Sequence, residues 1–313
     1  MNNKSNRFGV DLVTFSHPAY WGVTSFEEIN LLATEEPKQF WLRMLDDVAQ
    51  TGVTGIELTF APFSWQGAKE AFGGIEAFTL ALAQRGLSIS SGFFASLERT
   101  PNIADESVRT SLLNEAQSCA EFLQACGADV MVIGCPLRPT LGEMPIEVFG
   151  FDQAQKLAEF LNQLGALLHT YGVRLALHTE VSTIFAMPRD VQLMMLLTDP
   201  YYVHLCPDSA HILLAGGDPT ATVQQHQSRI AISHWKDASG TFPSSIQIDS
   251  DIHDKHKPYF REFGTGDVDF DSWAKVILGK AENDWNILEL DASPNPVSSI
   301  AHALKEVASI KYQ

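Results

Sequence analysis

The chain repeats one local pattern, in which a helix-like amphipathic segment is followed by a glycine and then by a short apolar run. The pattern occurs at Thr51-Gly52-Val53, Arg85-Gly86-Leu87, Cys126-Gly127-Ala128 and Tyr171-Gly172-Val173. A glycine suits the left-handed conformation after a helix C-terminus, where a side chain would be strained. The following runs predict buried strands over residues 53–60, 87–94, 128–134 and 173–180.

The rest of the chain continues this alternation. Further strands are expected over residues 8–15, 202–207, 230–235 and 286–290, and helices over residues 38–51, 151–172, 188–198, 219–227, 271–280 and 296–310. Strands alternating with helices predict right-handed βαβ units and a parallel sheet. With the helix-like segments that precede Gly86 and Gly127, there are eight strand and eight helix candidates. This number favours an α/β fold of the closed (β/α)8 barrel type, with residues 1–313 as one domain, over an open doubly wound sheet.

Composition limits the kind of partner. Lys and Arg number 21 against 38 Asp and Glu, a formal charge of −17, so nucleic acid and anionic membranes would be repelled. A small-molecule partner is expected. The start of the chain shows no signal-like segment, and Cys119, Cys126, Cys135 and Cys206 form no C-x-x-C pair. These features are typical of a reduced, cytoplasmic protein with buried thiols.

Two spacings interrupt the regular rhythm. Residues 16–36 follow the first predicted strand, and residues 237–268 follow the seventh. Both are expected to be long loops at the C-terminal ends of strands, where barrel active sites are built, and to cover the substrate. The polar run at residues 249–257 is more typical of a solvated surface loop than of a second metal site.

Ionisable residues gather at the ends of the last four predicted strands. They come in pairs spaced two or three residues apart: His178 and Glu180, Asp208 and His211, His234 and Lys236, Glu289 and Asp291. Because the C-terminal ends of barrel strands meet at one mouth, these side chains are expected to lie together. The sequence thus predicts one polar site there.

A divalent metal ion is the expected occupant of that site. Glu180, Asp208, His234 and Glu289 form a mixed oxygen and nitrogen donor set without thiolate. Mn²⁺ is favoured, and Co²⁺, Zn²⁺, Fe²⁺ or Mg²⁺ would also suit. A cation would offset the repulsion between neighbouring carboxylates.

For most of the other polar and aromatic candidates, the sequence allows two possible roles. His211 either caps a turn or orients a ligand, and Lys236 either points inward or is a surface charge. His17 is expected either to bind substrate or to have no chemical role. Trp21, Trp65 and Phe94 are candidates for stacking on a sugar ring, although aromatic packing in the core is the simpler alternative, and Asp291 is a further substrate-binding candidate.

Several motifs resemble a known family. The stretch from Leu197 to His211, LTDPYYVHLCPDSAH, is followed by AGGDP, H-W-K-D at residues 234–237, FGTGDVDF at residues 263–270 and L-E-L-D at residues 288–291. Together they resemble the sugar isomerase/epimerase superfamily with the xylose-isomerase-like barrel, closest to its inosose dehydratase-like members. The resemblance extends over roughly residues 8–300.

The resemblance implies metal binding by Asp208, His234 and Glu289. It is weaker on the fifth strand, where many members have Glu at the position of His178 and this chain has His-Thr-Glu. Glu180 is therefore taken as the fourth ligand, with His178 as the alternative.

The expected chemistry is enolisation of a polyhydroxy ketone such as a keto-inositol or oxo-sugar. A base removes the proton beside the carbonyl, and β-elimination from the enediolate gives dehydration. His178 is the candidate base, with a metal-bound carboxylate or water as the alternative. Lys236 is expected to hold substrate oxygens or the developing negative charge.

Three other functions remain open. Cleavage of 3-oxo-glycosides by the catalytic subunit of a C-glycoside deglycosidase would require a small partner subunit. A sugar epimerase or isomerase would reprotonate the same enediolate. Assembly into a homo-oligomer is compatible with each of these functions. A non-catalytic sugar-binding barrel would lack a working base. Redox chemistry is disfavoured because no dinucleotide-binding glycine motif follows a strand.

Overall fold

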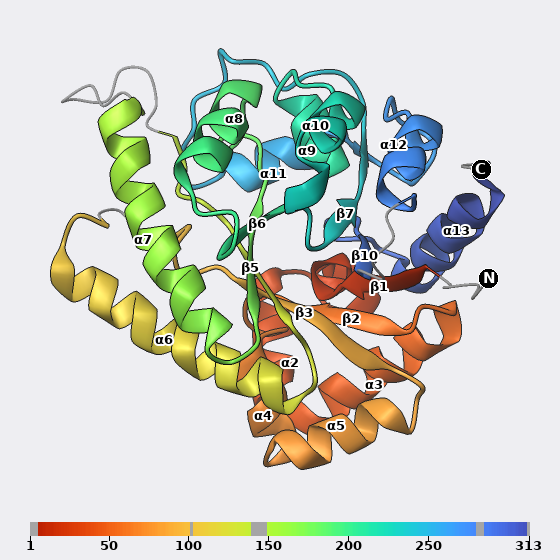
Figure 1. Cartoon of the computed structure of the whole chain (residues 1–313). Helices are drawn as coiled ribbons and strands as arrows, with labels where there is room; N and C mark the ends of the chain where they lie inside the picture. The colour runs from red at the N-terminus through yellow and green to blue at the C-terminus, as the bar shows by residue number, and fades with distance from the viewer. Residues whose placement is uncertain (1–5, 101–102, 139–148, 280–284, 312–313) are drawn as a thin grey trace, which may run out of the picture.

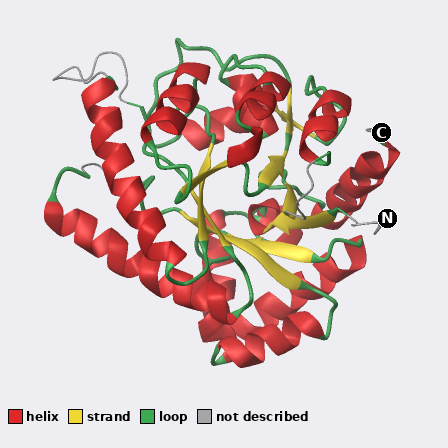
Figure 2. Ribbon diagram, viewed as in Figure 1, coloured by secondary structure: helices red, strands yellow, loops and turns green. Residues whose placement is uncertain are grey.

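Eight parallel strands form the centre of the molecule. The computed structural model describes residues 6–100, 103–138, 149–279 and 285–311. The strands are β1 (Arg7–Asp11), β2 (Gly55–Leu58), β3 (Ser88–Phe94), β4 (Val130–Ile133), β5 (Arg174–His178), β6 (Val203–Cys206), β7 (Ser233–Trp235) and β10 (Trp285–Leu288). Helices surround these strands on all sides of the view in Figure 1, and Figure 2 separates the two kinds of element by colour.

The sheet closes into a barrel between β6 and β7. The hydrogen-bonded order is β6-β5-β4-β3-β2-β1-β10-β7. Isolated parallel bridges join Leu205 to Ile230 and Asp208 to His234 across the remaining gap. There the amide of Ala231 donates to the Leu205 carbonyl at 3.1 Å, and that of His234 donates to the Pro207 carbonyl at 3.0 Å. The predicted (β/α)8 barrel is confirmed.

Alternate side chains of the strands fill two different cores. On β4, Val130 and Val132 belong to a small cluster inside the barrel, whereas Met131 and Ile133 belong to the larger core under the helices. This is the two-residue period expected of a strand buried on both faces. Trp285 fills the N-terminal end of the barrel, and a Cβ on Gly55 would lie only 2.6 Å from its ring.

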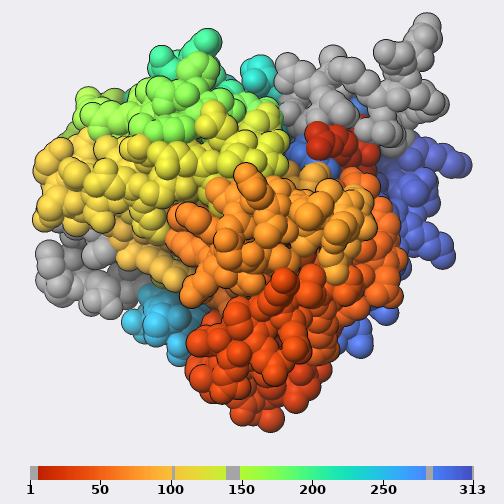
Figure 3. Space-filling model, turned by 90° about the horizontal axis from the view of Figure 1, so that it is seen from below, coloured from red at the N-terminus to blue at the C-terminus, as the bar shows by residue number. Residues whose placement is uncertain are grey.

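The helices follow the strands as the pattern predicts. They are α1 (Pro18–Trp21), α2 (Phe26–Glu35), α3 (Pro37–Thr51), α4 (Trp65–Phe72), α5 (Ile75–Ala83), α6 (Glu106–Ala125), α7 (Phe151–His169), α8 (Pro188–Leu197), α9 (Ser209–Leu214), α10 (Pro219–Gln225), α11 (Ile252–His256), α12 (Phe270–Ile277) and α13 (Pro296–Ser309). From below, elements of the first half of the chain cover the face, coloured red to yellow-green in Figure 3. Among the described helices, none is both long and apolar enough to cross a bilayer.

The glycine pattern is confirmed at all four positions. Gly52, Gly86, Gly127 and Gly172 have φ values of 94°, 69°, 76° and 70°. Each therefore takes the left-handed conformation that ends a helical segment and turns the chain into the next strand. The expected free cysteines are also present, three of them buried and Cys126 partly buried.

Two expectations about the first βα connection are wrong. The first strand ends at Asp11 rather than continuing to residue 15, because the Asp11 carboxylate accepts a hydrogen bond from the Val13 amide at 2.6 Å and starts a 3-10 helix over Leu12–Phe15. Residues 16–36 are largely helical, in α1 and α2. The Ser25 hydroxyl caps α2, which carries acidic residues in its first turn.

Residues 237–268, here named the cover loop, contain short elements instead of a continuous coil. β8 (Asp237–Ala238) pairs antiparallel with β9 (Phe260–Arg261), and α11 and a 3-10 helix (Lys257–Tyr259) lie between them. Ile252 and His256 on α11 are 0% and 1% exposed. The polar run is therefore only partly solvated.

Candidate active site

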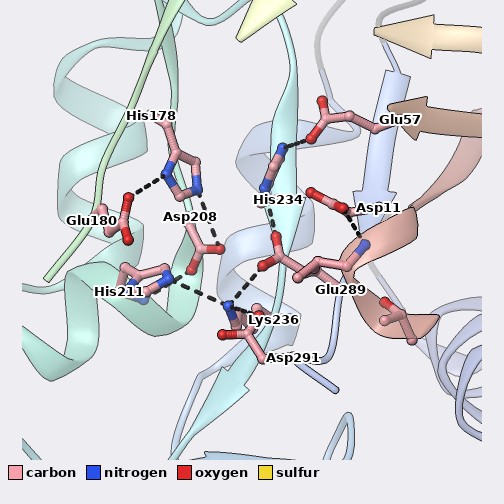
Figure 4. A network of polar contacts seen from close by, with 12 residues as sticks. Asp11, Glu57, His178, Glu180, Asp208, His211, His234, Lys236, Glu289 and Asp291 are labelled. Carbon is pink, nitrogen blue, oxygen red and sulfur yellow. Dashed lines mark hydrogen bonds and ion pairs between the residues drawn. The ribbon is translucent and has the colours of Figure 1, made fainter. Parts of the chain in front are cut away.

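Four strand ends bring one group of potential ligands together at the mouth of the barrel. The residues are His178 at the end of β5, Asp208 after β6, His234 on β7 and Glu289 after β10. Each contributes one donor atom, and these atoms lie within 4.8 Å of one another. Figure 4 shows His178 and Asp208 facing His234 and Glu289. Three of the four predicted ligands thus lie close together, along with His178.

Glu180 lies outside this group. Its Oε2 atom is 3.7 Å from His178 Nδ1, while His178 Nε2 is 3.7 Å from Asp208 Oδ2. The strand ends at His178, and Glu180 lies two residues further along the chain. Glu180 belongs instead to a second group of ionisable residues, with Glu98 and His253.

Lys236 links the next residues around the mouth. Its Nζ atom donates to Glu289 Oε1 at 2.7 Å and Asp291 Oδ1 at 2.6 Å, and lies 3.3 Å from His211 Nε2. Burial alone would lower the pKa of Lys236, but the charges of Asp291 and Glu289 outweigh burial and raise it. Of the two predicted alternatives for Lys236, an inward-pointing side chain or a surface charge, the structure shows the first. Lys236 is a buried cation.

His234 lies between two carboxylates. Its Nδ1 atom is 2.7 Å from Glu289 Oε2, and its Nε2 atom is 3.0 Å from Glu57 Oε1. Glu57 also accepts a hydrogen bond from the Ser91 hydroxyl at 2.5 Å. Burial first, and then the charges of Glu289 and Glu57, raise the pKa of nearby Asp11. These carboxylates hold the His234 ring in a fixed orientation.

Glu57 and Asp11 are absent from the predicted site. The signal that could have identified them is a carboxylate within a predicted strand that is otherwise mainly apolar. Both are buried, with exposures of 0% and 3%. An acidic residue at such a position is costly unless it has a partner.

Several buried polar atoms at the mouth have no hydrogen-bond partner. They are His178 Nδ1 and Nε2 and Asp208 Oδ2, together with His234 Nε2 and Glu57 Oε1, which lie 3.0 Å apart as an ion pair. A buried polar group without a hydrogen bond costs about 1–3 kcal/mol, so several on adjacent residues indicate a ligand-binding site. Two imidazoles and two carboxylates suit a divalent transition metal. The residues present therefore fit a metal ion.

His211 has two defined contacts. Asp208 caps α9 by accepting the His211 amide at 2.8 Å on Oδ1, which leaves Oδ2 facing the ligand group. The His211 Nδ1 atom accepts the Val181 amide at 3.3 Å. Burial and the charge of Lys236 hold the pKa of His211 well below its usual value. His211 is therefore neutral, with Nε2 directed at Lys236.

A second group of ionisable side chains includes Glu180. His253, from the cover loop, has Nδ1 3.5 Å from Glu180 Oε1 and Nε2 3.3 Å from Glu98 Oε1. Glu98 follows β3. The contact with Glu98 is the largest influence on the pKa of His253. Together with the charge of Glu180 it outweighs burial, which would lower the pKa, and raises it to about 9. The cover loop thus adds an imidazole that the sequence pattern did not assign.

His17 and the three predicted aromatic residues make their contacts away from the ligand group. Trp21 stacks on Phe40 with ring centroids 4.0 Å apart, and Trp65 packs against Phe122 at 5.7 Å. Phe94 is 3% exposed and belongs to the core under the helices. His17 caps α1 by accepting the Ala19 amide at 3.1 Å. None of these contacts reaches the ligand group, so substrate binding by these residues stays a prediction.

Two other aromatic residues line the mouth. Phe93 lies edge-on to His178 at 5.5 Å, and the Phe260 ring lies 4.0 Å from Lys236 Nζ. Phe93 is next to Phe94 on β3, so the two side chains point to opposite faces of the strand. If the face of β3 that lines the barrel had been known, Phe93 would have been identified as the residue at the mouth.

Comparison with known proteins agrees with the barrel fold. A family model described as xylose isomerase-like TIM barrel matches residues 45–310. An inosose dehydratase of Clostridium perfringens (strain 13 / Type A) is 26% identical over 245 residues, which cover 76% of this chain and 80% of that protein.

Two solved structures have the same fold at low sequence identity. One is a probable 3-DHS dehydratase, AsbF, involved in petrobactin synthesis from Bacillus anthracis, with a TM-score of 0.68 and 14% identity, covering 96% of this chain and 98% of that one. The other is an IOLI protein with a binding zinc atom, also with a TM-score of 0.68 and 14% identity, covering 97% and 98% of the chains. With a family model that matches most of its length and a relative named as a dehydratase, this chain belongs to the xylose isomerase-like TIM barrel family and is an enzyme.

Proposed function

We propose that this enzyme is a divalent-metal-dependent lyase that dehydrates a keto-inositol or a related polyhydroxy ketone. The observation that carries the proposal is the group of two imidazoles and two carboxylates, with unpartnered buried donor atoms, at the mouth of the barrel. The similarity to a protein named inosose dehydratase supports the substrate class.

His178, Asp208, His234 and Glu289 are the proposed ligands. The 4.8 Å limit on the spread of their donor atoms favours His178 over Glu180 as the fourth ligand. Mn²⁺ remains the favoured ion, with Co²⁺, Zn²⁺, Fe²⁺ and Mg²⁺ as alternatives. When bound, such a cation would polarise the substrate carbonyl and so acidify the neighbouring C–H group.

Glu180 then becomes the proposed base. Burial alone would raise the pKa of Glu180, but the adjacent imidazoles of His178 and His253 outweigh burial and lower it, which keeps the carboxylate ionised. Among the described residues, His253 Nδ1 lies 3.5 Å and His178 Nδ1 lies 3.7 Å from the oxygens of this carboxylate. An ionised carboxylate next to the ligand group is suited to accept a carbon-bound proton.

Lys236 and Asp291 are proposed to position the substrate. The Lys236 ammonium is fixed by Glu289 and Asp291, so it presents positive charge without needing to reorganise during the reaction. It would stabilise the negative charge that develops on the substrate oxygen. His211 Nε2 lies 3.3 Å from Lys236 Nζ, and because Nδ1 accepts the Val181 amide, His211 is proposed to limit the position of the ammonium by packing rather than by a hydrogen bond.

The test separates metal binding from proton removal. Purified protein is analysed for bound metal and then incubated with 2-keto-myo-inositol in D₂O, while exchange of the α-proton is followed by NMR. His178→Ala should lose metal, whereas Glu180→Gln should retain metal and lose exchange. Metal loss in Glu180→Gln with retention in His178→Ala would reverse the two roles. A wild-type protein that exchanges no proton with keto-inositols or 3-oxo-glucosides would exclude enolisation.

A further inference from the structure

His253 lies on a segment that is held firmly over the mouth. α11 is a single helical turn, and its residues Ile252 and His256 are buried on either side of His253. His256 Nε2 lies 2.9 Å from the Ser182 hydroxyl, and its ring packs edge-on against Phe242 at 4.6 Å. These contacts fix α11 to the chain that leaves β5, so the position of His253 is defined.

The His253 side chain is accessible, unlike Ile252 and His256 on the same helix. It is 48% exposed, although its two nitrogens face Glu98 and Glu180 at 3.3 and 3.5 Å. Two carboxylates beside an imidazole favour its protonated form. An exposed imidazolium at this place can contact a substrate that lies in the mouth.

The other potential proton donors around the mouth are already engaged. Lys236 is bound by Glu289 and Asp291, His256 lies against Ser182, and His211 is bound by the Val181 amide. His178 and His234 belong to the proposed ligand group. Within the described residues of the mouth, His253 is thus the cationic donor that retains an exposed face.

We propose that His253 protonates the leaving hydroxyl of the substrate, an inference that rests on the proposed function. Glu180 takes the α-proton from carbon, and the C–H electron pair is first held in the enolate of the substrate. When the C–O bond at the β-carbon breaks, that electron pair forms the new C=C bond, and the departing oxygen takes the proton of the imidazolium and leaves as water. Protonated Glu180 then releases its proton to solvent and neutral His253 regains one from solvent, so that atoms and charge balance.

The test uses two leaving groups and two measurements. In His253→Gln, dehydration of 2-keto-myo-inositol should be slower by about 10²–10⁴-fold in kcat, the usual contribution of a general acid. Exchange of the α-proton in D₂O should continue and fall far less than dehydration, because the metal ligands are intact and His178 still favours the ionised form of Glu180. An analogue with fluoride at the leaving position should react equally fast with both proteins, since fluoride needs no protonation.

His169→Gln serves as the matched control, because His169 is an exposed histidine at the end of α7. It should leave both rates unchanged. Equal dehydration by wild type and His253→Gln would overturn the proposal, as would a change confined to KM. Joint loss of exchange and dehydration in His253→Gln would also overturn it, because His253 would then act before the C–O bond breaks. Absence of exchange in the wild type would contradict the proposed function itself.

Discussion

Both histidines in the proposed ligand group lie between carboxylates. His234 has Glu289 on one side and Glu57 on the other, and His178 has Asp208 and Glu180. A carboxylate behind an imidazole fixes the ring and increases its basicity as a ligand. The outer carboxylate of Glu57, 3.0 Å from His234 Nε2, is therefore expected to affect metal binding without belonging to the ligand group.

Replacing Glu57 by Gln should weaken metal binding by about 10–100-fold, because the amide keeps the shape but removes the charge opposite His234 Nε2. The affinity is measured by competition with a chromophoric chelator. Glu76→Gln, on the exposed side of α5, is the control and should bind metal like the wild type. Unchanged affinity in Glu57→Gln would show that the 3.0 Å contact with His234 has no role in binding.

Much of the candidate site was predictable from residue type and strand position. Asp208, His234 and Glu289 lie where parallel strands end, and that rule needs only the strand assignments. The choice between His178 and Glu180 was not predictable, because both follow the same apolar run and only the end of β5 separates them. The contact of Phe93 rather than Phe94 with His178 depended on which face of β3 lines the barrel.

Among the elements, the cover loop has the most unusual local chemistry. The Asp237 carboxylate accepts the Gly266 amide at 2.8 Å and the Val268 amide at 3.3 Å, which ties together the two ends of the loop. The H-W-K-D and FGTGDVDF motifs thus form one structural unit. This pairing of residues far apart in sequence is a tertiary contact that periodicity could not reveal.

Gly266→Ala should destabilise the cover loop, because a Cβ there would lie 2.4 Å from Asp237 Oδ1 and 2.5 Å from the Ala238 carbonyl oxygen. We expect a loss of about 3 kcal/mol in the free energy of unfolding, at the upper end of overpacking effects. Urea denaturation measures this loss, and limited proteolysis locates it. Gly264→Ala, which meets only Glu306 at 3.8 Å but has a φ of +79°, should cost roughly 1 kcal/mol.

Acidification should loosen α11 before it unfolds the barrel. Burial lowers the pKa of His256 from 6.5 to about 4, so the unfolded segment binds a proton at a higher pH than the folded one. The stabilising effect of neutral His256 is complete above pH 6.5 and is lost as the pH falls toward 4. The protection factors of the backbone amides in residues 252–260, which correct for the slower intrinsic exchange at low pH, should therefore fall between pH 6.5 and 4. His256→Gln should show a flatter response, and an equally steep one would assign the change to other groups.

At the scale of the whole molecule, the proposed metal site lies across the place where the barrel closes. β6 and β7 are joined by isolated bridges, whereas each other neighbouring pair of barrel strands is paired over three or four residues. One of these bridges joins Asp208 to His234, both proposed ligands. A bound cation would therefore add a connection between β6 and β7, the two neighbouring strands with the least continuous backbone pairing.

Removing the metal should lower the thermal stability of the protein. A ligand at 100 times its Kd stabilises the folded state by about 2.7 kcal/mol, which corresponds to roughly 4 °C in Tm for a chain of this size. Calorimetry with and without a chelator measures the shift, and adding Mn²⁺ should restore it. Asp208→Asn should respond much less to either treatment. An equal Tm with and without metal would contradict a link between the site and barrel closure.

The shared location of the Asp208–His234 bridge and the proposed site has an evolutionary consequence. A substitution at either position is exposed to two selective pressures, one on turnover and one on keeping the folded population above the level that the cell requires. Descendants of such a protein that lose catalysis would still be constrained to keep these residues. The persistence of Asp208 and His234 in a lineage would therefore be poor evidence of activity, whereas Glu180 and His253, which are not part of this bridge, would be the first positions to drift.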